Sequence, residues 1–291
     1  MPTAFLGPRG TFSEEAARSF AGLEAELVAF TSFPALVSAV ETGLAEAAVL
    51  PIENSIEGAV STTLDLLIHE TKLKIAAEAV VQVRHFLVTT EAGSLGSIRQ
   101  VTSHPQALGQ CRRFLERCLP DVEQVASLST AGAIEEVAGA GDPSRAAIGP
   151  LRAVELYGGK ILAHDIQDNR ANVTRFVVLM LEDAAPTGDD KTSIGFTLKS
   201  NVAGALYRVL GELADENLQM TKIESRPTKS WLGEYVFLID LEGHATEPAV
   251  ARALDRIRES CDMMKVFGSY PRYQLESLAD ALDPPLRYAR R

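Results

Sequence analysis

The sequence predicts an α/β protein whose chain divides into two parts of different architecture. In residues 1–181, short apolar segments of strand character alternate with helical segments, an order typical of a mostly parallel sheet with helices on both faces. In residues 191–272 the predicted order is βαββαβ, which is the ferredoxin-like order. The acidic segment 182–190, with its proline and glycine, is predicted to be a linker. Residues 273–291 are left as a C-terminal tail.

Each predicted element of the first part has its own local signal. Thr11 and Glu14 have the spacing of a capping box at the start of a helix. The segment 33–43 has proline near its start and glycine at its end, as helices often do. The apolar segments predict strands at residues 3–7, 46–55, 73–90, 99–104, 145–150, 160–166 and 175–181. The helical segments are 11–20, 33–43, 61–70, 105–118, 129–139 and 151–158.

The second part shows the same kind of signals in a different order. Its first predicted helix places four apolar side chains on one face, where they can pack on a sheet: Leu206, Val209, Leu210 and Leu213. The predicted strands are 191–199, 218–227, 233–243 and 264–270, and the predicted helices are 203–217 and 247–261. This order predicts a small antiparallel sheet covered by two helices.

Composition excludes several classes of function. A net charge of −11 argues against nucleic-acid binding, and three scattered cysteines and five histidines without paired spacing argue against a metal site. The glycines of "GPRG" do not form a dinucleotide-binding motif, so no cofactor is expected. No signal peptide or apolar run of membrane length is present, which predicts a cytoplasmic protein with no membrane contact. An anionic substrate would need an arginine or free helix N-termini.

The stretch "DNRANVTRFVVLML" carries the most unusual polar residues. Thr174 and Arg175 stand where the apolar strand 176–181 begins, and Asp168 and Asn172 precede them. An arginine at the mouth of a core strand suggests an anionic ligand. The same residues also fit an edge strand with a solvated Arg175 and a capping Asn172.

The segment "PIENSIEG" places polar residues after another apolar strand. Glu53 can serve as a proton donor if it is buried, because burial raises the pKa of a carboxyl group. Alternatively, Asn54 and Ser55 cap the next helix.

Three further segments follow predicted strands or open predicted helices. In "SHPQALGQ", Ser103 or His104 can cap the next helix, and Gln106 and Gln110 share one helical face. The N-termini in "GPRGTFS" and "STAGA" suit anion binding by backbone N–H groups, although Ser and Thr are also ordinary caps. Their candidate side chains are Thr11, Ser13, Ser129 and Thr130.

Taken together, these motifs resemble those of a known family. "GPRGTFSEEAA", "PIENSIEG", "SHPQALGQC", "STAGAIEEV" and "NVTRFVVL" resemble, in this order, the catalytic domain of prephenate dehydratases. The second part resembles their ACT regulatory domain, and the resemblance covers residues 3–272. It implies two α/β lobes, like a periplasmic binding protein, with the active site between them. The chain is expected to cross between the lobes near residues 75–80 and 160–166, and the strand with Thr174 is expected to return to the first lobe.

The resemblance also implies a reaction. The family converts prephenate to phenylpyruvate, water and carbon dioxide in phenylalanine biosynthesis, without a metal, cofactor or covalent intermediate. The threonine of the Thr-Arg-Phe motif is essential, here Thr174, and we expect its hydroxyl to donate a hydrogen bond to the leaving hydroxyl. Arg175 is expected to hold a substrate carboxylate. The other implicated residues are Glu53, Asn54, Ser103 and Gln110 as catalytic groups, and Thr11, Ser13, Ser129, Thr130 and Asn172 as substrate contacts.

The ACT resemblance implies regulation by L-phenylalanine bound between paired chains, hence a homodimer or homotetramer. The expected effector residues are Gly204, Ala205, Leu206, Glu224, Ser225, Arg226 and Pro227. One departure is Ala203, where the family usually has proline. Two alternatives stay open: an arogenate dehydratase, or a non-catalytic amino-acid sensor. The sequence shows no mutase-like or dehydrogenase-like region, so we expect a monofunctional form.

Overall fold

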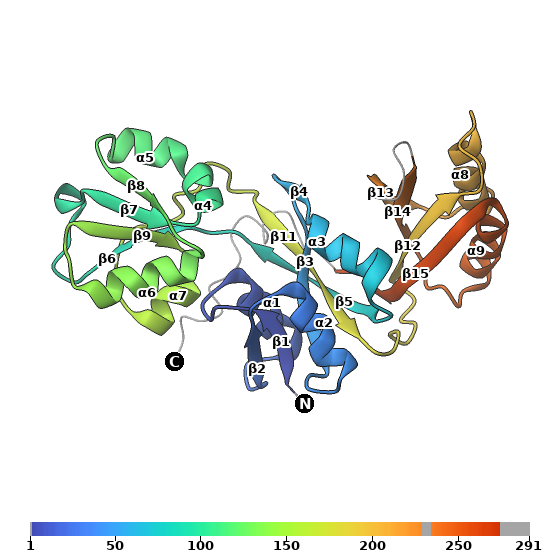
Figure 1. Ribbon diagram of the computed structural model, residues 1–291, viewed down its shortest axis with the longest axis horizontal. Coiled ribbons are helices and arrows are strands. Elements are labelled where there is room, and N and C mark those ends of the chain that lie inside the picture. Colours follow the sequence, from blue (N-terminus) through green and yellow to red (C-terminus); the bar gives the residue numbers. More distant parts are fainter. Residues whose placement is uncertain (1, 229–233, 274–291) are drawn as a thin grey trace.

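The computed structural model describes residues 2–228 and 234–273, and it has a mixed α/β fold built on three separate sheets. Figure 1 shows the three sheets in a row, each with its own helices. We call the middle unit the first lobe, the unit on its left the second lobe, and the unit on its right the C-terminal unit. The predicted tail 273–291 lies outside the described residues except for Tyr273.

The first lobe comprises β1 (Thr3–Leu6), α1 (Phe12–Ala21), β2 (Leu27–Phe30), α2 (Phe33–Glu41), β3 (Ala47–Asn54), β4 (Gly58–Ala59), α3 (Ser61–Asp65) with a π-helical continuation (Leu66–Glu70), β5 (Lys74–Gln82) and β11 (Val173–Met180). Its sheet has the order β2-β1-β3-β11-β5, with β4 paired to β3. β1, β2 and β3 are parallel, but β11 is antiparallel to both of its neighbours, so the sheet is mixed rather than mostly parallel.

The second lobe comprises β6 (Phe86–Thr89), β7 (Gln100–Ser103), α4 (Pro105–Gln110), α5 (Arg112–Cys118), β8 (Glu123–Ala126), α6 (Thr130–Ala140), β9 (Arg145–Gly149), α7 (Leu151–Tyr157) and β10 (Lys160–Ala163). Its sheet has the order β10-β6-β9-β7-β8. The single helix predicted at 105–118 is two helices, because the backbone leaves the helical conformation at Cys111.

Two segments connect the lobes. β5 lies entirely in the first sheet, so the first crossing occupies residues 83–85 rather than the expected 75–80. The second crossing occupies residues 164–172, after the end of β10, and β11 then returns to the first lobe as expected. The two crossings are paired: the N–H of Val83 donates to the carbonyl oxygen of Asn172 at 2.8 Å.

A separate contact joins the lobes at the start of α1. The carboxylate of Glu14 is fully buried and lies 3.4 Å from the guanidinium of Arg152 in α7. Gly10 has φ +83°, and a β-carbon there would come within 2.9 Å of Ala153 Cα. Glycine at this position therefore lets the first-lobe loop approach α7 closely.

The C-terminal unit comprises β12 (Asp190–Leu198), α8 (Ala205–Asp215), β13 (Met220–Pro227), β14 (Tyr235–Glu242), α9 (Pro248–Ser260) and β15 (Cys261–Pro271). Its antiparallel sheet has the order β13-β14-β12-β15, and the element order is the βαββαβ expected from the sequence. One face packs on α8 and α9, with Val209 and Leu213 buried as the helical pattern predicted.

The other face of this sheet packs against the first lobe. Val236, Leu238, Phe267 and Tyr270 belong to the same apolar core as the first-lobe strands. Gly268 permits the close approach of β15 to β5, because a β-carbon there would lie 2.2 Å from the carbonyl oxygen of Ile75. The first lobe is therefore packed on the C-terminal unit through a continuous core.

Candidate active site

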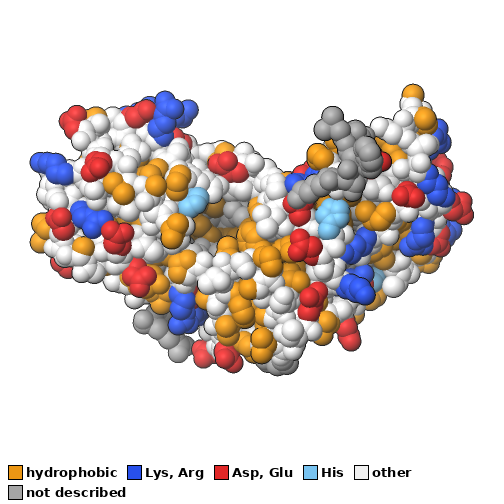
Figure 2. Space-filling model, viewed as in Figure 1, with side chains coloured by type: hydrophobic (Ala, Val, Ile, Leu, Met, Phe, Trp, Pro, Cys, Tyr) orange, Lys and Arg blue, Asp and Glu red, His pale blue; other side chains and the backbone are white. Residues whose placement is uncertain are grey.

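A cavity of about 380 Å³ lies between the first and second lobes. Figure 2 shows that the upper side of the molecule is hollowed between the second lobe and the C-terminal unit, above the first lobe. The N-termini of α1 and α6, one face of α4, and the ends of β3 and β11 enclose the cavity. Its lining includes seven of the residues predicted to act in catalysis or substrate binding: Thr11, Ser13, Asn54, Gln110, Ser129, Thr130 and Thr174.

Asn54 fixes the direction of the hydrogen bond to Thr174. The side-chain oxygen of Asn54 accepts from the backbone N–H groups of Ile56 and Glu57, both at 3.0 Å, so its orientation is determined. The Asn54 amide nitrogen therefore faces Thr174 Oγ1 at 2.9 Å and can only donate. Because Thr174 accepts this bond, its own hydroxyl proton is free to be donated elsewhere. The arrangement makes Thr174 a hydrogen-bond donor at the cavity wall.

Asn172 lies behind this pair. Its side chain is fully buried, and its oxygen accepts from the Asn54 amide nitrogen at 2.8 Å. Asn172 is not among the residues that line the cavity. It orients Asn54 and does not contact the space where a substrate would lie.

The two helix N-termini open toward the cavity. Thr11 Oγ1 accepts from the N–H of Glu14 at 3.4 Å, and Ser129 Oγ accepts from the N–H of Gly132 at 2.9 Å. The predicted capping box is only half formed, because Glu14 accepts from the N–H of Gly10 instead of the N–H of Thr11. The remaining first-turn N–H groups of each helix have no helical acceptor, so each end presents donors suited to an anion.

Gln110 is held by a residue that sequence reasoning did not select. His85 is buried, lines the cavity, and lies with Nε2 3.1 Å from Gln110 Oε1. Burial lowers the pKa of His85 below its usual value, and the hydrogen bond to Gln110 opposes this shift in part. In the neutral ring, Nε2 carries the proton and donates to Gln110, which leaves the Gln110 amide N–H groups for other acceptors. A lone histidine between two strands gave little sequence signal.

The cavity wall carries no fixed charge among the described residues. Its titratable lining side chains are His85 and His104, and none of the lining residues is Asp, Glu, Lys or Arg. Backbone N–H groups, hydroxyls and amides must therefore provide most of the attraction for an anion. Their fixed dipoles are worth more in a closed cavity than in water.

Arg175 and Glu53 lie outside this cavity, contrary to their expected roles. Arg175 pairs with Glu53 at 3.2 Å, on the face of the sheet that meets the C-terminal unit. A bulge in β3 explains why Glu53 points away from the cavity. Arg175 pairs with Glu53 and the next residue, Phe176, pairs with Pro51, so β3 has one extra residue between Pro51 and Glu53. The extra residue turns Pro51 and Asn54 toward the cavity and Glu53 away from it.

Ser103 is also separated from the cavity. Its side chain is fully buried, and its hydroxyl donates to the carbonyl oxygen of Ile148 at 2.6 Å. This bond ties the end of β7 to β9 inside the second lobe. The residue that caps α4 is His104, which accepts from the N–H of Gln106 at 3.3 Å. Ser103 thus has a packing position, and a direct catalytic role is not supported by its geometry.

Comparison with known proteins identifies the family of this chain. A family model described as prephenate dehydratase matches residues 3–184. The prephenate dehydratase of Amycolatopsis methanolica is 42% identical over 287 residues, covering 98% of this chain and 92% of that protein. This chain belongs to the prephenate dehydratase family.

Two solved structures of similar chains extend the likeness to the C-terminal unit. The prephenate dehydratase of Arthrobacter aurescens in complex with L-Phe shares 35% identity with a TM-score of 0.86, covering 94% of this chain and 90% of that chain. A structure described as GqqA, a novel type of quorum quenching acylase, shares 32% identity with a TM-score of 0.85, covering 95% and 100%. The matches therefore include the C-terminal unit as well as the two lobes.

In this prephenate dehydratase family member, the two expected effector motifs lie at one end of the C-terminal sheet. Phe196 and Ser225 are both paired with Phe237, so the end of β12 and the end of β13 are level with each other. Gly204, with φ +81°, opens α8 just beyond this end of β12. Glycine suits this left-handed conformation at the turn into the helix.

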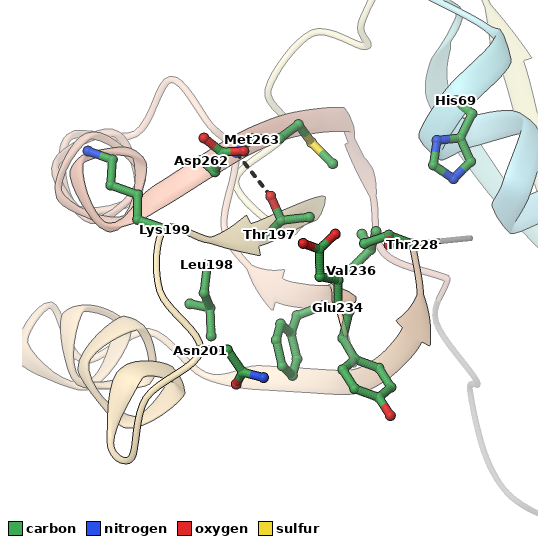
Figure 3. Close-up of a pocket in the computed structure, with 12 residues that line it drawn as sticks. His69, Thr197, Leu198, Lys199, Asn201, Thr228, Glu234, Val236, Asp262 and Met263 are labelled. Atoms are coloured by element: carbon green, nitrogen blue, oxygen red, sulfur yellow. Dashed lines mark hydrogen bonds between the residues drawn. The ribbon is translucent and has the colours of Figure 1, made fainter. Parts of the chain in front are cut away.

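A second cavity, of about 510 Å³, lies next to these motifs (Figure 3). None of the seven predicted effector residues lines it, but Asn201 and Thr228 do, and they are the near neighbours of the two motifs in sequence. His69 of the first lobe forms the wall opposite the C-terminal sheet, as Figure 3 shows. Within the wall, Thr197 Oγ1 accepts from the N–H of Met263 at 3.1 Å.

Proposed function

We propose that this protein is a prephenate dehydratase, which converts prephenate to phenylpyruvate with loss of water and carbon dioxide. The observation that carries the proposal is the fixed Asn54–Thr174 hydrogen bond, which leaves the Thr174 proton free at the wall of the cavity between the lobes. Membership of the prephenate dehydratase family supports it.

The chemistry needs a donor for the departing hydroxyl. A threonine hydroxyl is too weak an acid to release its proton outright, so Thr174 stabilises the developing charge on the leaving oxygen through a hydrogen bond. The electron pair of the breaking bond to the ring carboxylate moves into the ring and expels the hydroxide, so carbon dioxide leaves and the ring becomes aromatic, which supplies the driving force. The departing hydroxide takes up a proton from solvent to become water. Asn54 acts on Thr174 by donating to it, which favours the orientation in which the Thr174 hydroxyl donates to the substrate.

The substrate carries two carboxylates, and the cavity offers neutral donors for both. The N-termini of α1 and α6 supply backbone N–H groups and the hydroxyls of Ser13 and Thr130. Gln110 supplies amide N–H groups whose direction His85 sets. This assignment replaces Arg175, which is engaged outside the cavity.

The finer architecture is part of the proposal. We assign the two lobes to a catalytic domain of periplasmic-binding-protein type, and the C-terminal unit to an ACT domain that binds L-phenylalanine between paired chains. The βαββαβ order supports the second assignment. The L-Phe in the Arthrobacter aurescens structure supports the choice of effector. Gly204–Leu206 and Glu224–Pro227 remain the proposed effector contacts.

The test is phenylpyruvate formation by the purified protein and three variants. Thr174→Ala removes the donor, and we expect kcat to fall by about 100–1,000-fold. Thr174→Ser keeps a hydroxyl and should retain much more activity. Thr102→Ala is the matched control, since Thr102 is a strand threonine that does not line the cavity. Near-normal turnover by Thr174→Ala would show that the assignment is wrong.

The same assay distinguishes the alternatives. A higher kcat/KM with arogenate than with prephenate would identify an arogenate dehydratase. Turnover of neither compound, together with calorimetric binding of L-phenylalanine, would identify a sensor. Analytical ultracentrifugation with and without L-phenylalanine tests the proposed dimer or tetramer.

A further inference from the structure

Six charged side chains meet between the first lobe and the C-terminal unit, and we call them the interface cluster. The first lobe supplies Glu53 from β3, Glu78 from β5 and Arg175 from β11, and the C-terminal unit supplies Lys191 from β12, Lys222 from β13 and Asp240 from β14. Their separations are 2.9 Å for Arg175–Asp240, 3.3 Å for Arg175–Glu78, 3.2 Å for both Arg175–Glu53 and Lys222–Glu53, and 3.0 Å for Lys191–Glu78.

Arg175 stands at the centre of this cluster. It contacts all three carboxylates, and its side chain is 15% exposed. Burial alone would lower the pKa of Arg175, but the nearby carboxylates of Asp240 and Glu78 raise it. Within the cluster, three positive charges face three negative ones. Asp240 is 10% exposed and is the carboxylate nearest to Arg175, so its removal leaves Arg175 less well compensated in a partly buried site.

The cluster lies directly behind the catalytic pair. In the register of β3 and β11, Thr174 is opposite Asn54 and Arg175 is opposite Glu53. Neighbouring residues on a strand point to opposite faces. The same two rungs of the sheet therefore present Thr174 and Asn54 to the cavity, and Arg175 and Glu53 to the C-terminal unit.

Ion pairs continue from the cluster to the proposed effector motif. Lys222 lies 3.4 Å from Glu224, and Glu224 lies 3.8 Å from Arg226. Arg226 also donates to Ser61 Oγ, at the start of α3, at 3.0 Å. A movement of β13 relative to the first lobe would thus change the contacts of Glu53, the neighbour of Asn54.

We propose that Arg175, Glu53, Lys222 and Asp240 are positioning residues that let the C-terminal unit set the geometry of Thr174 and Asn54. In this role Arg175 does not bind substrate. Its ion pairs restrain β3 and β11 from the face of the sheet opposite the cavity, and we call this restraint the clamp. The inference rests on the proposed function of Thr174. A displacement of a catalytic group by about 1 Å can cost about 100-fold in rate, so a loosened clamp is sufficient to change turnover.

The first test is Asp240→Asn, which removes the charge facing Arg175 from a residue remote from the cavity. We expect kcat for prephenate to fall about tenfold with KM changed less than about twofold, because the donor acts mainly in the transition state. Asp255→Asn is the matched control, since Asp255 pairs with Arg258 on α9, outside the cluster, and kcat should not change. In a Thr174→Ala background, Asp240→Asn should have little further effect. A full tenfold loss in that background would overturn the proposal.

A second measurement does not depend on turnover. Hydrogen–deuterium exchange of the strand segments around Glu53–Asn54 and Val173–Thr174 should be faster in Asp240→Asn than in wild type, and unchanged in Asp255→Asn. Unchanged exchange in Asp240→Asn would overturn the clamp. If wild type fails to consume prephenate yet Asp240→Asn loosens these strands, the proposed function falls and the clamp stands.

Discussion

Thr174 and Arg175 show that one strand can serve two sides of a protein. The two residues are adjacent, but Thr174 faces the cavity and Arg175 faces the C-terminal unit. The sequence singled out both, because a hydroxyl and a guanidinium at the start of an apolar strand are unusual. The sequence alone could not show which groups each side chain contacts. The carboxylates near Arg175 come from β3, β5 and β14, which only the fold brings together.

His85 makes a prediction at the same scale. Burial lowers its pKa in the folded protein, whereas a histidine in the unfolded chain has a pKa of about 6.5. The unfolded chain therefore binds the proton more tightly. The contribution of neutral His85 to the free energy of unfolding is complete above pH 6.5. It is lost as the pH falls toward the pKa of the folded state, by up to about 1.4 kcal/mol per pH unit. Denaturant unfolding at pH 7.5 and 5.5 should show that the advantage of wild type over His85→Gln shrinks at the lower pH. An advantage independent of pH would contradict this assignment.

At the scale of elements, the predictable features are the ones set by local sequence. Helix caps and long apolar runs identified α1, α6, β3 and β11. β2 and β8 were not predicted. Their side chains are largely half-buried or exposed, whereas those of β1 and β7, which have the same length, are mostly buried. The bulge between Pro51 and Glu53 could not be predicted either, because it is defined by pairing with β11. It decides which residues of β3 reach the cavity.

The helix N-termini give a prediction with an internal control. Ser129 caps α6 at the cavity, and Ser32 caps α2 away from it by accepting from the N–H of Ala35 at 3.3 Å. Replacing either with alanine should cost about 1 kcal/mol of stability. Only Ser129→Ala should also raise KM for prephenate, by about 5–10-fold, because it removes a hydroxyl from the proposed anion site. Thermal unfolding and steady-state kinetics of both variants check this, and equal KM values would refute the site.

At the scale of the whole molecule, the first lobe lies between the second lobe and the C-terminal unit (Figure 1), and the cavity lies on its second-lobe side. Its strands β3 and β11 therefore touch both functional regions at once. The sequence predicted the two parts and their boundary, but not that they share an apolar core containing Leu50, Ile75 and Leu238. That core makes the C-terminal unit a structural neighbour of the active site. The proposed clamp implies that a change in how this unit packs alters the positions of β3 and β11.

Lys222 supplies the prediction that belongs to this scale, because it joins Glu53 of the first lobe to Glu224 of the proposed effector motif. We expect L-phenylalanine to lower kcat/KM of the wild type by about 5–150-fold, the usual range of allosteric coupling. Lys222→Met should still bind L-phenylalanine in calorimetry, but its inhibition should be at least about threefold weaker, since the link to Glu53 is lost. Lys160→Met is the matched control, because Lys160 lies in the second lobe on β10, and its inhibition should equal that of wild type. Equal inhibition of Lys222→Met and wild type would mean that the effector acts by another route. A wild type that binds L-phenylalanine without inhibition would refute the regulatory role itself.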